Sequence, residues 1–104
     1  MKYEYDTDAY IKQISNSNSY FNTFLDKESL AAGVLSLDPG EEDTQEPHES
    51  DEMYYVLKGN GLLRINKNDY KIKPGKAFFV PKNTRHYFFG NTKKLIVLYF
   101  FGGS

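Results

Sequence analysis

The chain has 104 residues with 13 basic and 14 acidic side chains, a formal net charge of −1, and a length that allows one domain with a modest core. The balanced charge argues against nucleic acid or an anionic membrane as a partner, because both attract basic proteins. Cysteine is absent, which excludes disulfides and thiolate metal sites and is typical of a cytoplasmic protein.

The first 19 residues are polar and are expected to form an N-terminal extension. They contain no apolar leader, and no apolar run in the chain approaches the roughly 20 residues that cross a bilayer, so we expect neither a signal peptide nor a membrane span. One short helix is predicted, capped by Thr7 or Asp8 and followed by a loop at residues 15–19. Its apolar face, at helical spacing, consists of Tyr10, Ile11 and Ile14.

From residue 20 to residue 104 we expect a single β domain, because segments rich in β-branched and aromatic residues alternate with turn residues. The Gly59-Asn60-Gly61 turn predicts a β-hairpin between the strands on either side of it, and Gly33 is expected at a bulge. Strands of this length and spacing are typical of an all-β sandwich, jelly roll or small barrel. The expected strands are 20–25, 30–37, 52–58, 62–65, 70–72, 77–80, 85–89 and 95–101.

The segment at residues 40–61, GEEDTQEPHESDEMYYVLKGNG, combines polar ligand types with a strand. His48 lies in its acidic half, and Glu52 begins the strand. Since side chains alternate between the two faces of a strand, one face carries Glu52, Tyr54 and Val56, and the other carries Met53, Tyr55 and Leu57. Both sets are apolar apart from the carboxylate, so we expect the strand to be covered on both faces. A carboxylate buried there is costly unless it is paired or bound to a metal.

The second histidine, His86, shares a strand face with Phe88. If this strand lies beside or opposite the one that begins at Glu52, His48, Glu52 and His86 can converge. Two imidazoles and one carboxylate make an open ligand set of the kind that iron favours and that manganese, zinc or nickel accepts. Glu46, two residues before His48, points the same way in an extended segment and is a candidate fourth ligand.

The spacing of these residues resembles the first motif of the cupin superfamily. That motif is a glycine, five residues, His, one residue, His, three or four residues, Glu, six residues and Gly. Gly40, Glu46, His48, Glu52 and Gly59 match it in spacing throughout. The one departure in residue type is Glu46, which occupies the first histidine's position.

The second cupin motif is a glycine, five residues, Pro, one residue, Gly, two residues, His, three residues and Asn. Gly75, Pro81, Asn83 and His86 follow this spacing, and Gly90 occupies the closing Asn position. Asn83 replaces a glycine, a mild change because Asn tolerates a positive φ better than most residues do.

The resemblance covers about residues 30–101 and implies a small single-domain cupin, that is, a jelly-roll barrel or double-stranded β-helix. It also implies a divalent metal ion (iron, manganese, zinc or nickel) and a small-molecule ligand or substrate. The metal ligands carried over by resemblance are His48, Glu52 and His86, with Glu46 in the remaining position. A carboxylate there would favour Mn²⁺ or Fe²⁺ over copper.

The fold leaves three functions open, since cupin-like folds host dioxygenases, isomerases, epimerases, storage proteins and sensor domains. The first is a metal-dependent enzyme, dioxygenase- or isomerase-like, that acts on a small organic molecule. The second is a non-catalytic module that binds a small ligand or a metal ion. The third is a metal-free barrel that serves as a dimerisation unit.

Further side chains of these segments have two expected roles. Tyr54 and Phe88 share faces with the proposed ligands and are candidates for the ligand pocket, although core packing is the commoner role for such aromatics. The outward apolar face of strand 52–58 and the aromatic strand 95–101 predict a partner, most simply a twofold homodimer. The acidic neighbours of the motif are expected to be solvated, and these are Glu41, Glu42, Asp43, Glu49 and Asp51.

Overall fold

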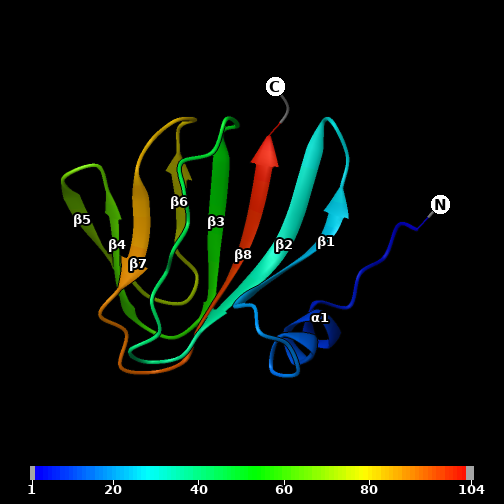
Figure 1. Cartoon of the computed structure of the whole chain (residues 1–104), viewed down its shortest axis with the longest axis horizontal. Coiled ribbons are helices and arrows are strands. Elements are labelled where there is room, and N and C mark those ends of the chain that lie inside the picture. Colours follow the sequence, from blue (N-terminus) through cyan, green and yellow to red (C-terminus); the bar gives the residue numbers. More distant parts are fainter. Residues whose placement is uncertain (1, 103–104) are drawn as a thin grey trace.

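The computed structural model describes residues 2–102 and contains one helix and eight strands (Figure 1). Residues 1, 103 and 104, the ends of the expected extension and domain, lie outside the described range. All eight expected strands are present, with ends that differ by at most two residues. The elements are α1 (Thr7–Ile14), β1 (Phe21–Asp26), β2 (Leu30–Leu37), β3 (Glu52–Lys58), β4 (Gly61–Ile65), β5 (Asn68–Ile72), β6 (Ala77–Val80), β7 (His86–Phe89) and β8 (Leu95–Gly102).

The strands form two antiparallel sheets, one of five strands in the order β1-β2-β8-β3-β6 and one of three in the order β5-β4-β7. The main core lies between the sheets, because inward side chains of both meet there. It is built from Leu35, Leu37, Tyr54, Val56, Leu63, Ile72, Val80, Phe88, Leu95, Val97 and Tyr99. The expected all-β jelly-roll architecture is therefore confirmed. No helix within residues 2–102 has the length and apolar character needed to cross a membrane.

The N-cap of helix α1 lies one residue before the first of the two caps expected from the sequence. The side chain of Asp6, and not that of Thr7 or Asp8, accepts the hydrogen bonds that cap the first turn. Its Oδ1 atom accepts from the backbone N–H of Asp8 at 3.1 Å and of Ala9 at 3.3 Å. Asp6 can do this because its backbone is extended while the next residues are helical.

The predicted apolar face of α1 packs on the outer surface of the larger sheet. Ile14 is buried against Val34 of β2 and Ile96 of β8, with Tyr10 and Ile11 beside it. This cluster also reaches Leu57, the last outward apolar residue of β3. Helix α1 thus covers part of the outer face of the larger sheet, and the sheet itself lies between the helix and the main core.

The expectation that β3 is covered on both faces is wrong within the single chain. Glu52, Tyr54 and Val56 do face the core and are buried. On the outer face, however, Met53 and Tyr55 each retain 41% of their exposure. The reason is that α1 packs over β1 and β2 and reaches only the Leu57 end of β3.

The predicted hairpin between β3 and β4 is also wrong, because the two strands belong to different sheets. The chain crosses from one sheet to the other at Gly59 and Gly61, whose φ angles are +101° and +126°. A Cβ atom on Gly59 would lie 2.7 Å from the Cα of Leu95, and one on Gly61 would lie 3.2 Å from the Cβ of Asn91. Glycine is therefore required at both positions because distant segments pack against the backbone there, and not because the chain makes a tight two-residue turn.

The expected bulge lies on β1, opposite Gly33 and not at it. The register between β1 and β2 shifts between Thr23 and Leu25, which face Gly33 and Ala32. Gly33 has a different role, since a Cβ atom there would collide with the hydroxyl group of Tyr99. The missing side chain makes room for the Tyr99 ring, which borders the candidate site described next.

Candidate metal centre

Three side chains from distant parts of the sequence converge at one end of the space between the sheets. His48, Glu52 and His86 each offer one potential ligand atom, and these atoms lie within 4.8 Å of one another. Nε2 of His86 is 3.2 Å from Oε1 of Glu52, and Nε2 of His48 is 3.9 Å from the same oxygen. The two imidazole ring centroids are 5.6 Å apart. The convergence predicted from strand parity is present.

Each of the three residues has a different structural support. Glu52 is the first residue of β3 and points inward from the larger sheet, while His86 is the first residue of β7 and points inward from the smaller one. His48 comes from the loop between β2 and β3. Its backbone carbonyl accepts a hydrogen bond of 2.6 Å from the N–H of Asn83, whose φ is +60°. Asn83 thus adopts the left-handed conformation expected for a glycine position, and ties the His48 loop to the segment that carries His86.

A second hydrogen bond joins the same two segments. Asp51 is exposed, as expected, but its Oδ1 atom also accepts from the backbone N–H of Lys82 at 2.9 Å. Two hydrogen bonds therefore fasten the segment that carries His48 to the segment that leads to His86.

The carboxylate of Glu52 is the least conventional group of the site. Its side chain is 2% exposed, and neither of its oxygens has a hydrogen-bond partner in the described part of the chain. A buried carboxylate without such partners is costly, since no water replaces the interactions that it loses. Its free lone pairs face two imidazoles, a donor set that suits a divalent cation. The residues present therefore fit a metal ion.

The ring of His86 is oriented for ligation by its other nitrogen. Nδ1 lies 2.8 Å from the carbonyl oxygen of Thr84, which can only accept, so Nδ1 carries a proton and Nε2 is the nitrogen that faces Glu52. Burial lowers the pKa of His86, but Glu52 and the Thr84 carbonyl raise it, and the net shift is upward. The pKa of His48 is lowered, mainly by burial. A metal ion would compete with a proton for Nε2 of His86.

Asp43, expected to be solvated with its acidic neighbours, is instead buried at 8% exposure. Its carboxylate accepts from the backbone N–H of Phe88 at 2.9 Å and from the hydroxyl of Tyr20 at 3.0 Å. It also accepts two hydrogen bonds from Gln45, one from the backbone N–H and one from Nε2. Asp43 thus anchors the loop between β2 and β3 to β7. Asp43 could not be singled out from the sequence, because other acidic residues of the same segment, Glu41 and Glu42, precede it and are exposed.

Gln45 is the residue near the three-residue group that the sequence reasoning missed. Its Nε2 atom donates to Asp43, so its Oε1 atom faces the site, 3.3 Å from Nε2 of His48 and 3.1 Å from the hydroxyl of Tyr54. The same hydroxyl lies 3.0 Å from Nε2 of His86. Burial and the carboxylate of Glu52 raise the pKa of Tyr54 well above its usual value, so Tyr54 keeps its proton and acts as a donor. A chain of polar contacts therefore runs from Asp43 to His86.

Tyr54 and Phe88, the two pocket candidates, are both core residues with exposures of 0% and 2%. Their rings meet edge to face, with centroids 4.8 Å apart. Among described residues they are absent from the lining of the cavity beside His48. Contact with a ligand stays a prediction for both, and the hydroxyl of Tyr54 is the part that reaches the site.

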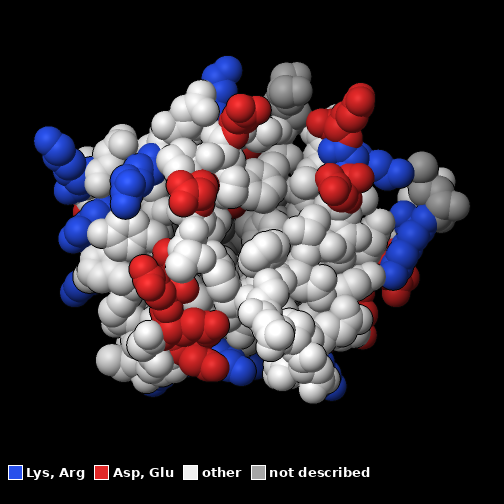
Figure 2. Space-filling model, in the orientation of Figure 1, with Lys and Arg blue, Asp and Glu red and all other residues white. Residues whose placement is uncertain are grey.

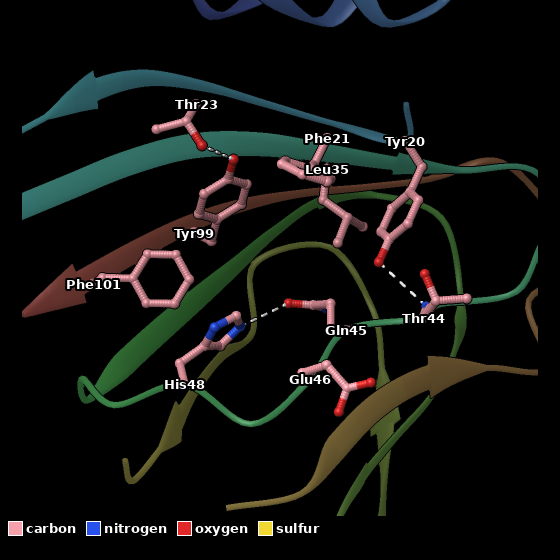
Figure 3. A pocket seen from close by; sticks show the side chains of 10 residues that line it. All are labelled: Tyr20, Phe21, Thr23, Leu35, Thr44, Gln45, Glu46, His48, Tyr99 and Phe101. Carbon is pink, nitrogen blue, oxygen red and sulfur yellow. Dashed lines mark hydrogen bonds between the residues drawn. The ribbon is translucent and has the colours of Figure 1, made fainter. Parts of the chain in front are cut away.

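Glu46, the candidate fourth ligand, is exposed and lies outside the group formed by His48, Glu52 and His86. It lines a cavity of about 290 Å³ that opens beside His48 (Figure 3). On the face drawn in Figure 2, acidic side chains follow one side of a hollow. A role of Glu46 in ligation stays a prediction, and its place in this structure is at the cavity.

Comparison with known proteins identifies the family of the chain. The family model for the cupin domain matches residues 33–101 of the chain, a range that contains His48, Glu52 and His86. An uncharacterized protein of Streptomyces coelicolor is 29% identical over 90 residues, which cover 86% of this chain and 85% of that protein.

Solved structures share the fold. KdgF from a Halomonas species superposes with a TM-score of 0.71 at 24% sequence identity, covering 81% of this chain and 79% of that one. A chain from the crystal structures of two DMSP lyases superposes with a TM-score of 0.67 at 28% identity, covering 75% of this chain and 40% of the lyase chain.

Proposed function

The chain belongs to the cupin family, and we propose that it binds one divalent metal ion through His48, Glu52 and His86 and acts with it on a small organic molecule in the adjoining cavity. The observation that carries this proposal is the carboxylate of Glu52, which is buried without a hydrogen-bond partner among the described residues and faces two imidazole nitrogens. A carboxylate with a purely structural role is normally hydrogen-bonded when buried.

A bound divalent ion would supply a Lewis acid with open positions for a substrate oxygen. The protein's own residues hold the site in shape. The Thr84 carbonyl fixes the ring of His86, and the amide of Gln45, held by Asp43, keeps its oxygen toward His48 and Tyr54. Two nitrogens and one carboxylate oxygen are compatible with iron, manganese, zinc or nickel.

Elemental analysis of protein purified without chelator or a metal-carrying tag tests the metal site. We expect close to one ion per chain, and His86→Ala and His48→Ala are expected to lose it because each removes one of three ligands. Glu46→Gln is the matched control and is expected to keep the ion. Metal loss in Glu46→Gln would add Glu46 to the ligand set, and a full metal content in both histidine variants would refute the proposed site.

A binding module without turnover is the second candidate, because the chain offers few groups for proton transfer. Within residues 2–102 the buried carboxylates are Glu52, which the proposed ion would occupy, and Asp43, which already accepts four hydrogen bonds. The exposed carboxylate of Glu46 at the cavity remains for general base catalysis. The similarity to a DMSP lyase chain supports an enzyme. The experiment is to test the metal-loaded protein against a panel of substrates. Turnover that is lost in His86→Ala would show that the protein is an enzyme and not a binding module.

We also propose that the chain forms a twofold homodimer through the outer face of the larger sheet. Met53 on β3 lies in register with Phe79 on β6 and with Phe100 on β8. These three side chains and Tyr55 are 36–55% exposed. A continuous exposed apolar stripe of this kind favours a partner surface of the same chemistry, which a second copy supplies.

If the protein is a dimer, size-exclusion chromatography with light scattering should give the mass of two chains. Phe79→Asp is expected to lower the measured mass to that of one chain. The substitution places a charge on the most exposed residue of the stripe, which the dimer would bury. An unpaired charge there costs several kcal/mol of association, on the order of the 2–7 kcal/mol for burying polar groups. Tyr3→Asp, at an exposed tyrosine in the N-terminal extension, is the control and should remain dimeric. A monomeric wild type would contradict the proposal.

A further inference from the structure

The cavity beside His48 lies between the loop that carries Gln45 and the inner face of the larger sheet (Figure 3). Its volume of about 290 Å³ is near the lower end of small-molecule sites. Four aromatic rings and Leu35 make up most of its wall, and these rings belong to Tyr20, Phe21, Tyr99 and Phe101. A ligand in this cavity would therefore contact mainly flat apolar side chains.

The polar groups of the wall mostly have partners within the protein already. The hydroxyl of Tyr99 is 2.7 Å from Oγ1 of Thr23. The hydroxyl of Tyr20 donates to Asp43 at 3.0 Å and accepts from the backbone N–H of Thr44 at 3.2 Å. A ligand rich in hydroxyl groups, such as a sugar, would find few free donors and acceptors here. Each unpaired polar group costs about 1–3 kcal/mol on burial.

The charge of the lining is unusual for a site that takes acids. None of the described residues that line the cavity is a lysine or an arginine, and its one carboxylate is that of Glu46. Phosphates and dicarboxylates would therefore enter without a side-chain cation to neutralise them. A metal ion at the three-residue group would be only partly neutralised by Glu52, so it would repel a cationic ligand and attract an anionic one. The exclusion of acids by the lining therefore applies to the metal-free cavity.

We infer that this cavity takes a small, uncharged molecule with a flat apolar body and an oxygen donor. Its walls select against phosphates, dicarboxylates and sugars, and the metal-loaded site selects against ammonium compounds. The oxygen donor rests on the proposed metal function, while the preference of the walls rests only on residues of the chain. Glu46 is then the residue that determines charge selectivity at the cavity.

Five probes test this inference against the protein in its metal-free and its Mn²⁺-loaded forms. Benzyl alcohol, benzylamine, benzoate and phenyl phosphate share one ring and differ in charge, and glucose differs in polarity. Dissociation constants are measured by calorimetry or by ligand-observed NMR. Benzyl alcohol is expected to bind at least about tenfold more tightly than benzoate, phenyl phosphate and glucose in the metal-free form, a difference of about 1.4 kcal/mol. In the Mn²⁺-loaded form it should also exceed benzylamine.

Glu46→Lys should change this order, raising the affinity for benzoate relative to benzyl alcohol by about tenfold, because it replaces the cavity's carboxylate with a cation. Glu42→Lys makes the same charge change on the same loop, outside the lining of this cavity, and should leave the order unchanged.

The inference is overturned if metal-free wild-type protein binds benzoate, phenyl phosphate or glucose as tightly as benzyl alcohol. Preference for benzylamine in the loaded form, or no binding of any probe, would overturn it as well. Failure to take up Mn²⁺ would refute the proposed metal function. The affinities of the metal-free protein for the probes would still test the selectivity of the cavity.

Discussion

Replacement of Glu52 with glutamine is expected to abolish metal-dependent stabilisation. At a pH at which His86 is neutral and no ion pair is lost, it should leave the metal-free protein at least as stable as the wild type. Glutamine has the same shape, but its amide is neutral and a poor metal ligand. At a free-metal concentration about 100 times the Kd, a bound ion stabilises the fold by about 2.7 kcal/mol, and the variant should lose this gain. The metal-free variant no longer holds a buried carboxylate without a hydrogen-bond partner.

Thermal unfolding with and without Mn²⁺ or Zn²⁺ measures both effects. Glu49→Gln, at an exposed position in the same acidic segment, is the control and should behave as the wild type in both conditions. If Glu52 instead served only to pair with His86, the metal-free variant would unfold at a clearly lower temperature and metal would stabilise neither protein. That outcome would leave the three-residue group without a metal function.

Replacement of Asp43 with asparagine is expected to lower the free energy of unfolding by about 2–3 kcal/mol, the value of hydrogen bonds to a buried charged acceptor. All four contacts of this carboxylate come from donors, among them the buried backbone N–H of Phe88 and the amide of Gln45. The NH₂ group of asparagine would face one of them. Because Asp43 also anchors to β7 the loop that carries His48, metal affinity should fall as well, by about 10–100-fold.

Urea unfolding and metal titration of the Asp43→Asn protein measure these two effects. Glu42→Gln removes a charge one residue away at an exposed position and should change unfolding free energy by less than about 0.5 kcal/mol. An Asp43→Asn protein with wild-type stability would mean that the carboxylate does not anchor the loop.

The strands and the three converging residues could be predicted because their signals are local. Alternation along β3 grouped Glu52 and Tyr54 on one face of the strand, and the spacing of the two motifs marked His48 and His86. The left-handed backbone of Asn83 also followed from residue type, since few side chains tolerate a positive φ.

What could not be predicted depends on contacts between residues far apart in the sequence. Gly59 has the sequence of a turn, but its real constraint is the backbone of Leu95, which only the folded chain brings close. Asp43 differs from its solvated neighbours only in meeting Phe88, 45 residues later. Likewise, Gln45 becomes part of the site through Asp43, and no motif position marks it.

Anomalous diffraction from crystals grown with Zn²⁺ tests most directly whether His48, Glu52 and His86 hold a single ion. We predict one strong anomalous peak about 2.0–2.2 Å from a nitrogen of each histidine and an oxygen of Glu52. A density map with no peak between these three side chains, or with either imidazole turned outward to solvent, would contradict it.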